Sequence, residues 1–398
     1  NNTDYTYMIV VVSESGLTGI QQEEMVLLMN TEPSENREDA ISFSNVLSSP
    51  GQSNIELPVP YGMDAQEWQL ELYAGGLSAI QSFALNAPLL ENQPATIASI
   101  ILSSQALTGL TSSSFAVEPY IELLEQTQED DGGWGFLTAE GSDATLTSFI
   151  VFSLLESGST TMMEQENLDR LITYLTNTIE KESSIQASNR YALQSTTLAY
   201  QELSIVIEQY KTLPIAEQFF LLQALSQQPG SEATQTEILT AMLSNALYDD
   251  YGAYFAGDGS IPLYSDDESV TAMMLLSLGR LQPESEMIPQ LRNWLIHQGL
   301  TTDLKNNPVS NALSLLALQR TMHLTSASGV FGVQVLQENE SVAQFSSSEI
   351  SETPFESTLV IDPLSPSISI IHEEGQGNLY YRLSTANTDD NDLFNGIT

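Results

Sequence analysis

The chain has 398 residues, of which 41% are hydrophobic, enough for a sizeable core in two bodies or in one large body with attachments. Ten Lys and Arg residues face 52 Asp and Glu residues, and the net charge of −42 excludes general binding to nucleic acid or to an anionic membrane surface. The absence of cysteine excludes disulfides, thiolate metal sites and cysteine nucleophiles, and no apolar run is long enough to predict a membrane span.

Charged residues make up only 16% of the chain, and lysine occurs at three positions. A polar, lysine-poor and negative surface stays soluble and resists nonspecific adhesion. This favours a secreted or cell-surface protein, with a salt-adapted cytosolic protein as the alternative. The first residues show neither a start methionine nor a basic leader, so we expect a mature or excised piece of a longer product.

Residues 1–75 are predicted to be β-rich because short β-branched and aromatic runs alternate with turn-forming stretches. The predicted strands are residues 5–12, 24–29, 55–59 and 68–72.

Residues 76–325 change to the helical period, with apolar residues recurring every three or four positions. The predicted helices include residues 97–107, 120–124, 149–155, 168–175, 191–200, 219–225, 238–247, 270–278, 288–295 and 312–318. Many short helices without intervening strands predict an all-helical body.

Residues 326–386 return to alternation, and the predicted strands are residues 330–335, 358–361, 368–371 and 379–383. The economical arrangement is one β-sandwich formed from both ends of the chain, with the helical body inserted into it. Two independent small β domains are the alternative. Residues 387–398 are interpreted as a linker or tail.

The helical body contains an internal echo. Residues 142–149 and 266–273 each combine small, hydroxyl and apolar residues behind an aspartate, and residues 307–313 form a weaker third copy. Asp143 and Asp266 are predicted to cap the helices that follow them. Small residues near these helix starts would let several inner helices crowd around one axis.

A loop rich in glycine precedes the first copy, where Asp130 and Asp131 lead into Gly132, Gly133 and Trp134. The glycines permit a tight backbone, and the tryptophan can fix the loop to a helix end. This string resembles the connection in α/α toroids, among them the thioester domain of the α2-macroglobulin family. The order of β-rich, helical and β-rich zones is similar to the bacterial branch of that family. The resemblance implies an α/α toroid inserted into a CUB-like β domain.

The sequence departs from the thioester members of that family at one decisive place. The residue that stands about where their cysteine lies is Asn92. Without a thiol no internal thioester can form, so covalent capture of a target is excluded. The resemblance then implies a non-catalytic extracellular protein with a protein partner, acting in protease trapping or protein–protein interaction without a cofactor. A structural subunit of a surface assembly is a further alternative.

A carbohydrate-active toroid enzyme is the alternative from a different class. Glycosidases and lyases set pairs of carboxylates around a cleft, and the candidates here are Asp130, Asp131, Asp250 and Asp266. Turn formation and helix capping explain the same residues without catalysis. An enzyme should bring these acids together in a deep cleft, whereas a binding module should have a filled toroid axis and dispersed acids.

Two further groups of residues could carry chemistry. Asp249, Asp250 and Asp258 are weak calcium candidates, as are the aspartates of the tail, because carboxylate oxygens suit a hard cation. His297 is predicted to cap the end of a helix, and His372 is predicted to be solvated. No histidine has metal-site spacing, so no metal or cofactor is expected.

Overall fold

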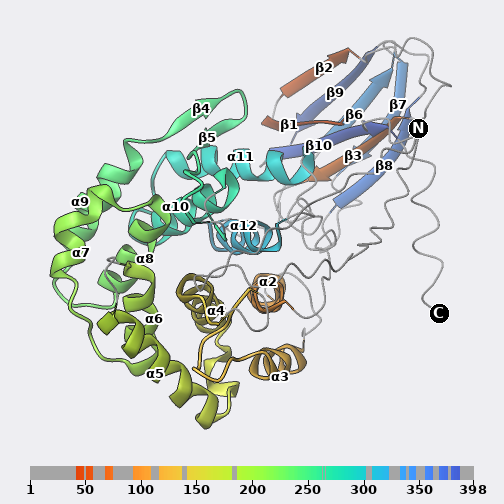
Figure 1. Cartoon of the computed structure of the whole chain (residues 1–398). Coiled ribbons are helices and arrows are strands. Elements are labelled where there is room, and N and C mark those ends of the chain that lie inside the picture. The colour runs from red at the N-terminus through yellow and green to blue at the C-terminus, as the bar shows by residue number, and fades with distance from the viewer. Residues whose placement is uncertain are drawn as a thin grey trace, which may run out of the picture. The chain divides into compact units, whose positions relative to one another are not determined.

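The structure is a computed structural model of the chain (Figure 1). It describes residues 42–48, 51–56, 68–74, 93–108, 116–136, 141–181, 186–261, 263–264, 266–301, 307–321, 332–337, 340–346, 355–361, 367–374 and 378–385. The chain divides into two compact units, Asn1–Ala40 and Ile41–Thr398, and every described residue belongs to the second.

The described part is mostly helical. Its eleven α-helices are α2 (Pro94–Thr108), α3 (Glu118–Gln126), α4 (Ala144–Glu156), α5 (Gln165–Lys181), α6 (Ala187–Thr197), α7 (Ser204–Gln209), α8 (Ile215–Ser226), α9 (Glu232–Leu243), α10 (Asp267–Leu281), α11 (Met287–Thr301) and α12 (Pro308–Thr321). Two short 3-10 helices, η1 (Ser159–Met162) and η2 (Tyr210–Thr212), complete the helical zone.

The helices differ in how much of their surface is buried. In α8, ten consecutive residues from Ala216 to Leu225 are buried, and α4, α10 and α12 are buried on nearly every side. By contrast, α3 buries only Ile121 and Leu124, one turn apart on a single stripe. A helix that is apolar all round is an interior helix, and a helix with one apolar stripe is a surface helix.

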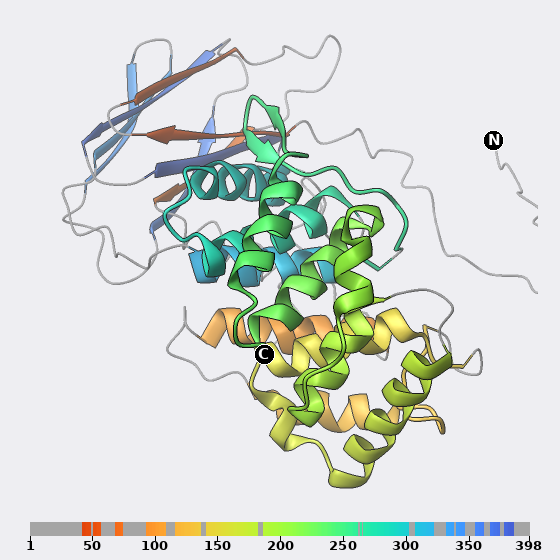
Figure 2. The ribbon, with the colours of Figure 1, turned by 90° about the vertical axis from the view of Figure 1, so that its left-hand side faces the viewer.

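The even-numbered helices contact one another in cyclic order. Helix α2 packs against α4, α4 against α6, α6 against α8, α8 against α10, α10 against α12, and α12 returns to α2 (Figures 1 and 2). The odd-numbered helices α3, α5, α9 and α11 each contact an even-numbered neighbour. We call α2, α4, α6, α8, α10 and α12 the inner helices.

The strands form two four-stranded antiparallel sheets. They are β1 (Ser42–Ser48), β2 (Gly51–Glu56), β3 (Trp68–Ala74), β6 (Gly332–Gln337), β7 (Glu340–Ser346), β8 (Phe355–Ile361), β9 (Ser367–Glu374) and β10 (Asn378–Thr385). The first sheet has the order β1-β10-β3-β8 and the second β2-β9-β6-β7. Strands that precede the helices therefore pair directly with strands that follow them, as in the register of Leu72 opposite Tyr381.

The two sheets share one hydrophobic core. Its buried members alternate along their strands, as expected for strands with one face covered. They are Leu70, Leu72, Val333, Val335, Ile368, Ile370, Leu379, Tyr381 and Leu383, from β3 and β10 of one sheet and β6 and β9 of the other. Because the inner faces of the two sheets are buried against each other, the register of strand pairing is fixed. A slip of one residue would move these side chains to the exposed face of the sheet.

Most predicted elements are confirmed, with informative differences. The helical zone is not free of strands, because β4 (Leu247–Asp249) and β5 (Gly252–Tyr254) form a hairpin between α9 and α10. Strands β1 and β7 were not predicted, and helix α6 ends at Thr197 rather than at residue 200. The strands predicted at residues 5–12 and 24–29, and the tail 387–398, lie outside the described residues.

Candidate functional site

The loop before α4 is a tight turn pressed onto α5. The N–H of Gly132 donates to the carbonyl of Glu129 (2.9 Å), and the N–H of Gly133 donates to the carboxylate of Asp131 (3.1 Å). Gly132 has a φ of +98°, and a Cβ built on it would lie 2.2 Å from the carbonyl oxygen of Arg170. Only glycine fits both the conformation and the space.

Trp134 closes this loop and is completely buried. Its indole Nε1 donates to the carbonyl of Leu124 at the end of α3 (2.9 Å), and its backbone N–H donates to the hydroxyl of Thr147 in α4 (3.0 Å). The loop therefore connects α3 to α4 through hydrogen bonds, and Gly132 allows the loop to pack closely against α5. Gly132, Gly133 and Trp134, which we singled out as architectural residues, lie at this junction.

The loop before α10 repeats the same construction. The carboxylate of Asp249 accepts from the N–H groups of Tyr251 (2.8 Å) and Gly252 (3.1 Å). Gly252 has a φ of +151°, and a Cβ on it would lie 2.2 Å from the carbonyl oxygen of Gln290 in α11. The backbone N–H of Phe255 donates to the hydroxyl of Thr271 in α10 (3.0 Å).

The two loops share the glycine and its close approach to the backbone of an outer helix. Gly132 and Gly252 are 120 residues apart, as are the carbonyl groups of Arg170 and Gln290 that they approach. The sequence echo at the helix starts is therefore one part of a larger structural repeat that includes the turn and the outer helix beneath it.

In the part of the chain that the structure describes, three helix starts are capped by the side chain of the residue just before them. Asp143 accepts from the N–H of Leu146 (2.8 Å) at α4, and Asp266 accepts from that of Ser269 (2.7 Å) at α10. At α12 the amide oxygen of Asn307 accepts from the N–H of Val309 (3.1 Å). Asp266 also accepts hydrogen bonds from the side chains of Asn307 (2.6 Å) and Ser310 (2.7 Å) at the start of α12. Its carboxylate thus joins two neighbouring inner helices.

A layer of buried polar groups lies at the first turns of the inner helices. Ser148 of α4 donates to Asn189 of α6 (2.7 Å), and the hydroxyl groups of Ser269 and Ser310 join α10 to α12 (2.9 Å). Glu217 of α8 is the one carboxylate in this layer, and it is 4% exposed. It accepts from the N–H groups of Ala187 (2.6 Å) and Ser188 (2.9 Å) and from the Ser188 hydroxyl (2.7 Å), so it caps α6 from another helix.

Aromatic rings fill the space beneath this layer. Phe152 packs edge-on against Phe219 and Phe220, with ring centroids 5.8 and 5.9 Å apart. Tyr264, which precedes α10, is completely buried between Phe149 (6.2 Å) and Phe220 (5.7 Å). These rings come from the inner helices α4 and α8 and from the second loop, and all of them belong to the one buried core of the helical zone.

Tyr264 carries a buried hydroxyl without a hydrogen bond of normal geometry among the described residues. Burial raises the pKa of its phenol well above 10, and the nearby carboxylates of Glu217 and Asp143 raise it further. The Ser188 hydroxyl faces the phenol and partly opposes that increase in pKa. Sequence inspection did not select Glu217 or Tyr264, because each stands in an ordinary apolar context and meets its partners only through the fold.

Glu217 gives a testable pH dependence. Burial raises the pKa of its carboxyl above 4.5, against the opposing effect of its three hydrogen bonds. The stabilisation associated with this carboxyl is therefore full below pH 4.5 and is lost as the pH rises through the folded-state pKa, because the unfolded chain ionises first. Each tenfold difference in proton affinity corresponds to about 1.4 kcal/mol.

We expect the wild type to lose stability relative to Glu217→Gln as the pH rises above 4.5. Urea unfolding of both proteins at several pH values between 4 and 8 measures the difference. The exposed Glu232→Gln serves as the control and should follow the wild type. Parallel curves of unfolding free energy against pH for the wild type and Glu217→Gln would contradict a raised pKa for Glu217.

The acid candidates do not converge on a common centre. Asp130 and Asp131 are exposed in the first loop, and Asp131 accepts from the Ser142 hydroxyl as well as from Gly133. Asp250 is exposed at the turn of the β4–β5 hairpin, whereas Asp266 caps α10. These four carboxylates therefore belong to three separate structural units.

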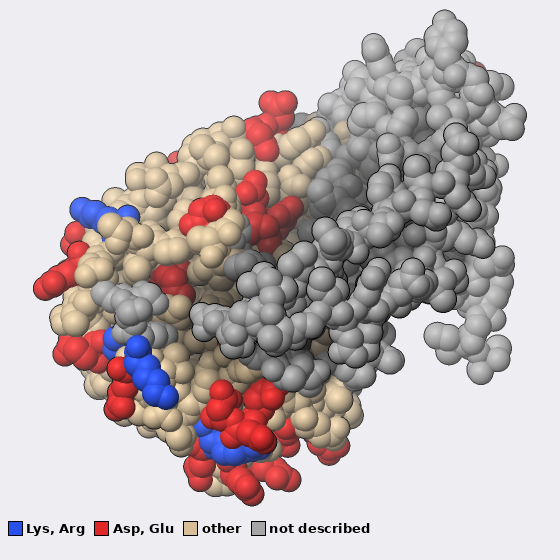
Figure 3. Space-filling model, in the orientation of Figure 1, with Lys and Arg blue, Asp and Glu red and all other residues tan. Residues whose placement is uncertain are grey.

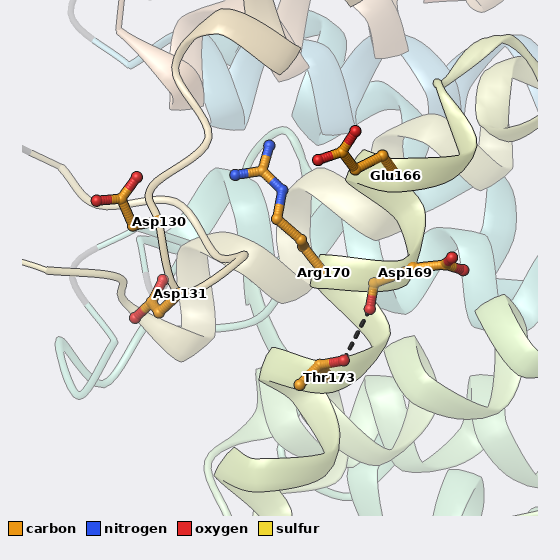
Figure 4. A pocket seen from close by; sticks show the side chains of 6 residues that line it. All are labelled: Asp130, Asp131, Glu166, Asp169, Arg170 and Thr173. Atoms are coloured by element: carbon orange, nitrogen blue, oxygen red, sulfur yellow. Dashed lines mark hydrogen bonds between the residues drawn. The ribbon is translucent and has the colours of Figure 1, made fainter.

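A surface hollow of about 450 Å³ lies between the first loop and α5 (Figure 4). Figure 4 shows Asp130 and Asp131 on the loop side and the remaining lining residues on the helix. Its lining consists of Asp130, Asp131, Glu166, Asp169, Arg170 and Thr173. Within the described ranges, no group of three or more Asp, Glu or His side chains is arranged to hold a metal ion.

The calcium and histidine candidates also have local structural roles. Asp249 accepts from two backbone N–H groups and from Trp294 Nε1 (2.9 Å), and Asp258 accepts from Ser260. His297 is not at a helix end, because α11 continues to Thr301, and its ring stacks on Tyr251 with centroids 3.4 Å apart. The prediction that His372 is solvated was wrong, since it is completely buried in β9. The position predicted to replace the thioester cysteine, Asn92, lies outside the described residues.

The described surface is strongly acidic. Figure 3 shows carboxylates scattered over the visible face with few basic side chains among them. None of the described helices combines the length and the apolar character that crossing a bilayer requires.

The structure thus defines a mostly helical protein with small antiparallel sheets. No protein-family model matches the chain, and no curated protein matches it. Among solved structures it is similar to Escherichia coli alpha-2-macroglobulin activated by porcine elastase, with a TM-score of 0.45 and 16% identity. That similarity covers 87% of this chain but 32% of the other, so the chain spans about a third of that protein's length.

Proposed function

We propose that this chain is a non-catalytic extracellular module that binds another protein. Its architecture would be an α/α toroid, residues 76–325, inserted into a CUB-like β-sandwich formed by residues 1–75 and 326–386. The cyclic order of the inner helices supports the toroid, and the pairing of β1 with β10, β2 with β9 and β3 with β8 supports the shared sandwich.

One observation supports a protein-binding function over an enzymatic one. The inner helices share one buried hydrophobic core, which includes the packed rings of Phe152, Phe220 and Tyr264. A small-molecule active site needs a concave space with convergent polar groups. Of the candidate acids, Asp131 instead forms a turn and Asp266 a helix cap, roles that account for them without catalysis.

Any capture of a partner by this chain would be noncovalent, because the sequence contains no cysteine to form a thioester. Protease trapping is the specific form of this proposal that follows from the resemblance to α2-macroglobulin. The acidic surface supports secretion or display at a cell surface, where a charged exterior limits nonspecific adhesion.

The test combines a binding and an activity measurement. We expect the chain to form complexes with members of a panel of active-site-blocked proteases in sedimentation velocity, and these complexes should dissociate in denaturing electrophoresis. We also expect no release of reducing ends from a polysaccharide panel. Sugar release that is lost in Asp131→Asn or Asp266→Asn, but kept in the exposed control Glu232→Gln, would overturn the proposal in favour of a glycosidase or lyase.

A further inference from the structure

A short segment after α6 displays large apolar side chains to solvent. Leu198 is 88% exposed, Tyr200 64% and Ile205 52%. We call residues 198–205 the 198–205 segment. Single exposed apolar residues are ordinary, but several within eight residues form the kind of patch that marks an interaction site.

Leu198 also has a backbone conformation that a leucine rarely adopts. Leu198 is the C-cap of α6 and has φ 56° and ψ 21°, the sole non-glycine residue with positive φ in the described part. After α4, Gly158 takes nearly the same conformation, with φ 70° and ψ 13°. Glycine adopts this region freely, whereas a leucine there is strained and brings no polar atom to relieve the strain. Local structure therefore favours glycine at position 198.

The polarity of the segment is inverted. Beneath it, the side chain of Gln194 is 1% exposed, and its Oε1 accepts from the N–H of Gln201 (3.0 Å) and from Gln228 Nε2 (2.9 Å). Gln228 also donates to the carbonyl of Gln201 (3.0 Å). Polar groups point inward and hold the backbone, while the apolar side chains point outward.

The segment is anchored at its far end as well. Leu203 and Val206 are buried in the helical core, and the carboxylate of Glu202 accepts from the N–H of Ser204 (2.9 Å). A backbone fixed at both ends presents Leu198, Tyr200 and Ile205 in a defined arrangement. Preorganisation of this kind reduces the conformational entropy that binding would otherwise remove.

Charge selects the kind of partner. Glu202 and Glu208 are exposed within and beside the segment, and Arg190 donates to the carbonyl of Glu202 (3.4 Å). The attraction for a basic partner therefore comes from the net charge of −42 on the chain. A second copy of the chain and an anionic bilayer would both be repelled by this field. A protein that offers lysine and arginine around an apolar pocket would be attracted and would also bury the exposed rings.

We propose that the 198–205 segment inserts Leu198 and Tyr200 into an apolar pocket on a partner protein, with basic residues of the partner around the rim. This proposal rests on the protein-binding function proposed above and adds the surface that performs it. It assigns a binding role to residues that the sequence pattern placed inside a helix.

The experiment uses a displayed library of random dodecapeptides selected against the whole chain. We expect the selected peptides to combine aromatic or aliphatic residues with Lys or Arg. Their affinity for the double variant Leu198→Gly with Tyr200→Ser should fall by about tenfold or more, as for the loss of an aromatic anchor. Met162→Gln removes a 48% exposed side chain elsewhere and should leave their affinity unchanged.

Folding of the variant does not obscure the result, because glycine relieves the strained backbone and the melting temperature should not fall. Affinity should also decrease with added salt, since charge steers the encounter. Peptides that bind the double variant as well as the wild type would overturn the assignment of this surface but leave the protein-binding function in place. Selection that yields no binding peptide, or reversible dimerisation or vesicle binding that is lost in the double variant, would overturn the partner assignment.

Discussion

Replacing Gly132 by alanine is expected to lower the free energy of unfolding by about 3 kcal/mol or more, a large effect for a single methyl group. The new Cβ would lie 2.2 Å from the carbonyl oxygen of Arg170, and this neighbour is helix backbone that cannot rotate away. The φ of +98° adds strain for any L residue. Equilibrium unfolding in urea, followed by circular dichroism, measures the loss.

Gly230→Ala is the matched control. Gly230 also has positive φ (+80°), but a Cβ there meets nothing within 4 Å. Its substitution should therefore show only the conformational penalty, about 1 kcal/mol. Gly252→Ala should resemble Gly132→Ala, because its Cβ would approach the carbonyl oxygen of Gln290 just as closely. Equal losses in the Gly132 and Gly230 variants would show that the contact with α5 is not tight.

Replacing Trp134 by alanine is expected to destabilise the chain by about 3–5 kcal/mol, the range for large aromatic side chains removed from a core. Trp134 is completely buried and fixes the end of α3 to the start of α4 through two hydrogen bonds. The loss can be measured by urea unfolding, with thermal unfolding as a second readout.

Two variants separate the causes of that loss. Trp134→Phe keeps most of the buried ring but leaves the carbonyl of Leu124 without the indole donor, so it should lose about 1–2 kcal/mol. Phe136→Ala removes a ring that is 44% exposed only two residues away, and it should lose less than Trp134→Phe. A Phe136 variant as unstable as the Trp134→Ala variant would contradict the central role of Trp134.

Local patterns accounted for the elements whose causes lie within a few residues. Asp143 and Asp266 cap helices by accepting from N–H groups three positions later, so the cap can be recognised from the sequence. The strands β3, β9 and β10 show the alternation of a half-buried strand. By contrast, β1 has the polar sequence SFSNVLS, and only its pairing with β10 makes it a strand.

The polar centre could not be predicted in the same way. Glu217 caps α6 although it lies about thirty residues further along the chain, and a buried carboxylate in an apolar helix gives no local sign of its partner. His372 was expected in solvent because two glutamates follow it, but it lies two residues after Ile370 on the buried face of β9, which packs into the core shared by the two sheets. Both outcomes depend on which helices and strands become neighbours.

Two properties could be read from the sequence alone. They are the absence of thioester chemistry and the order of β-rich, helical and β-rich segments along the chain. A chain without cysteine forms no thioester, and apolar periodicity distinguishes helical from extended segments, because both are properties of composition and of neighbouring residues. Only the tertiary structure decided that the rings of α4 and α8 pack together with Tyr264, that Gly132 and Gly252 lie against outer helices, and that Leu198 faces solvent. These features arise from contacts between residues that are distant in the chain, and burial at a given position is fixed by those contacts rather than by the residue's own type.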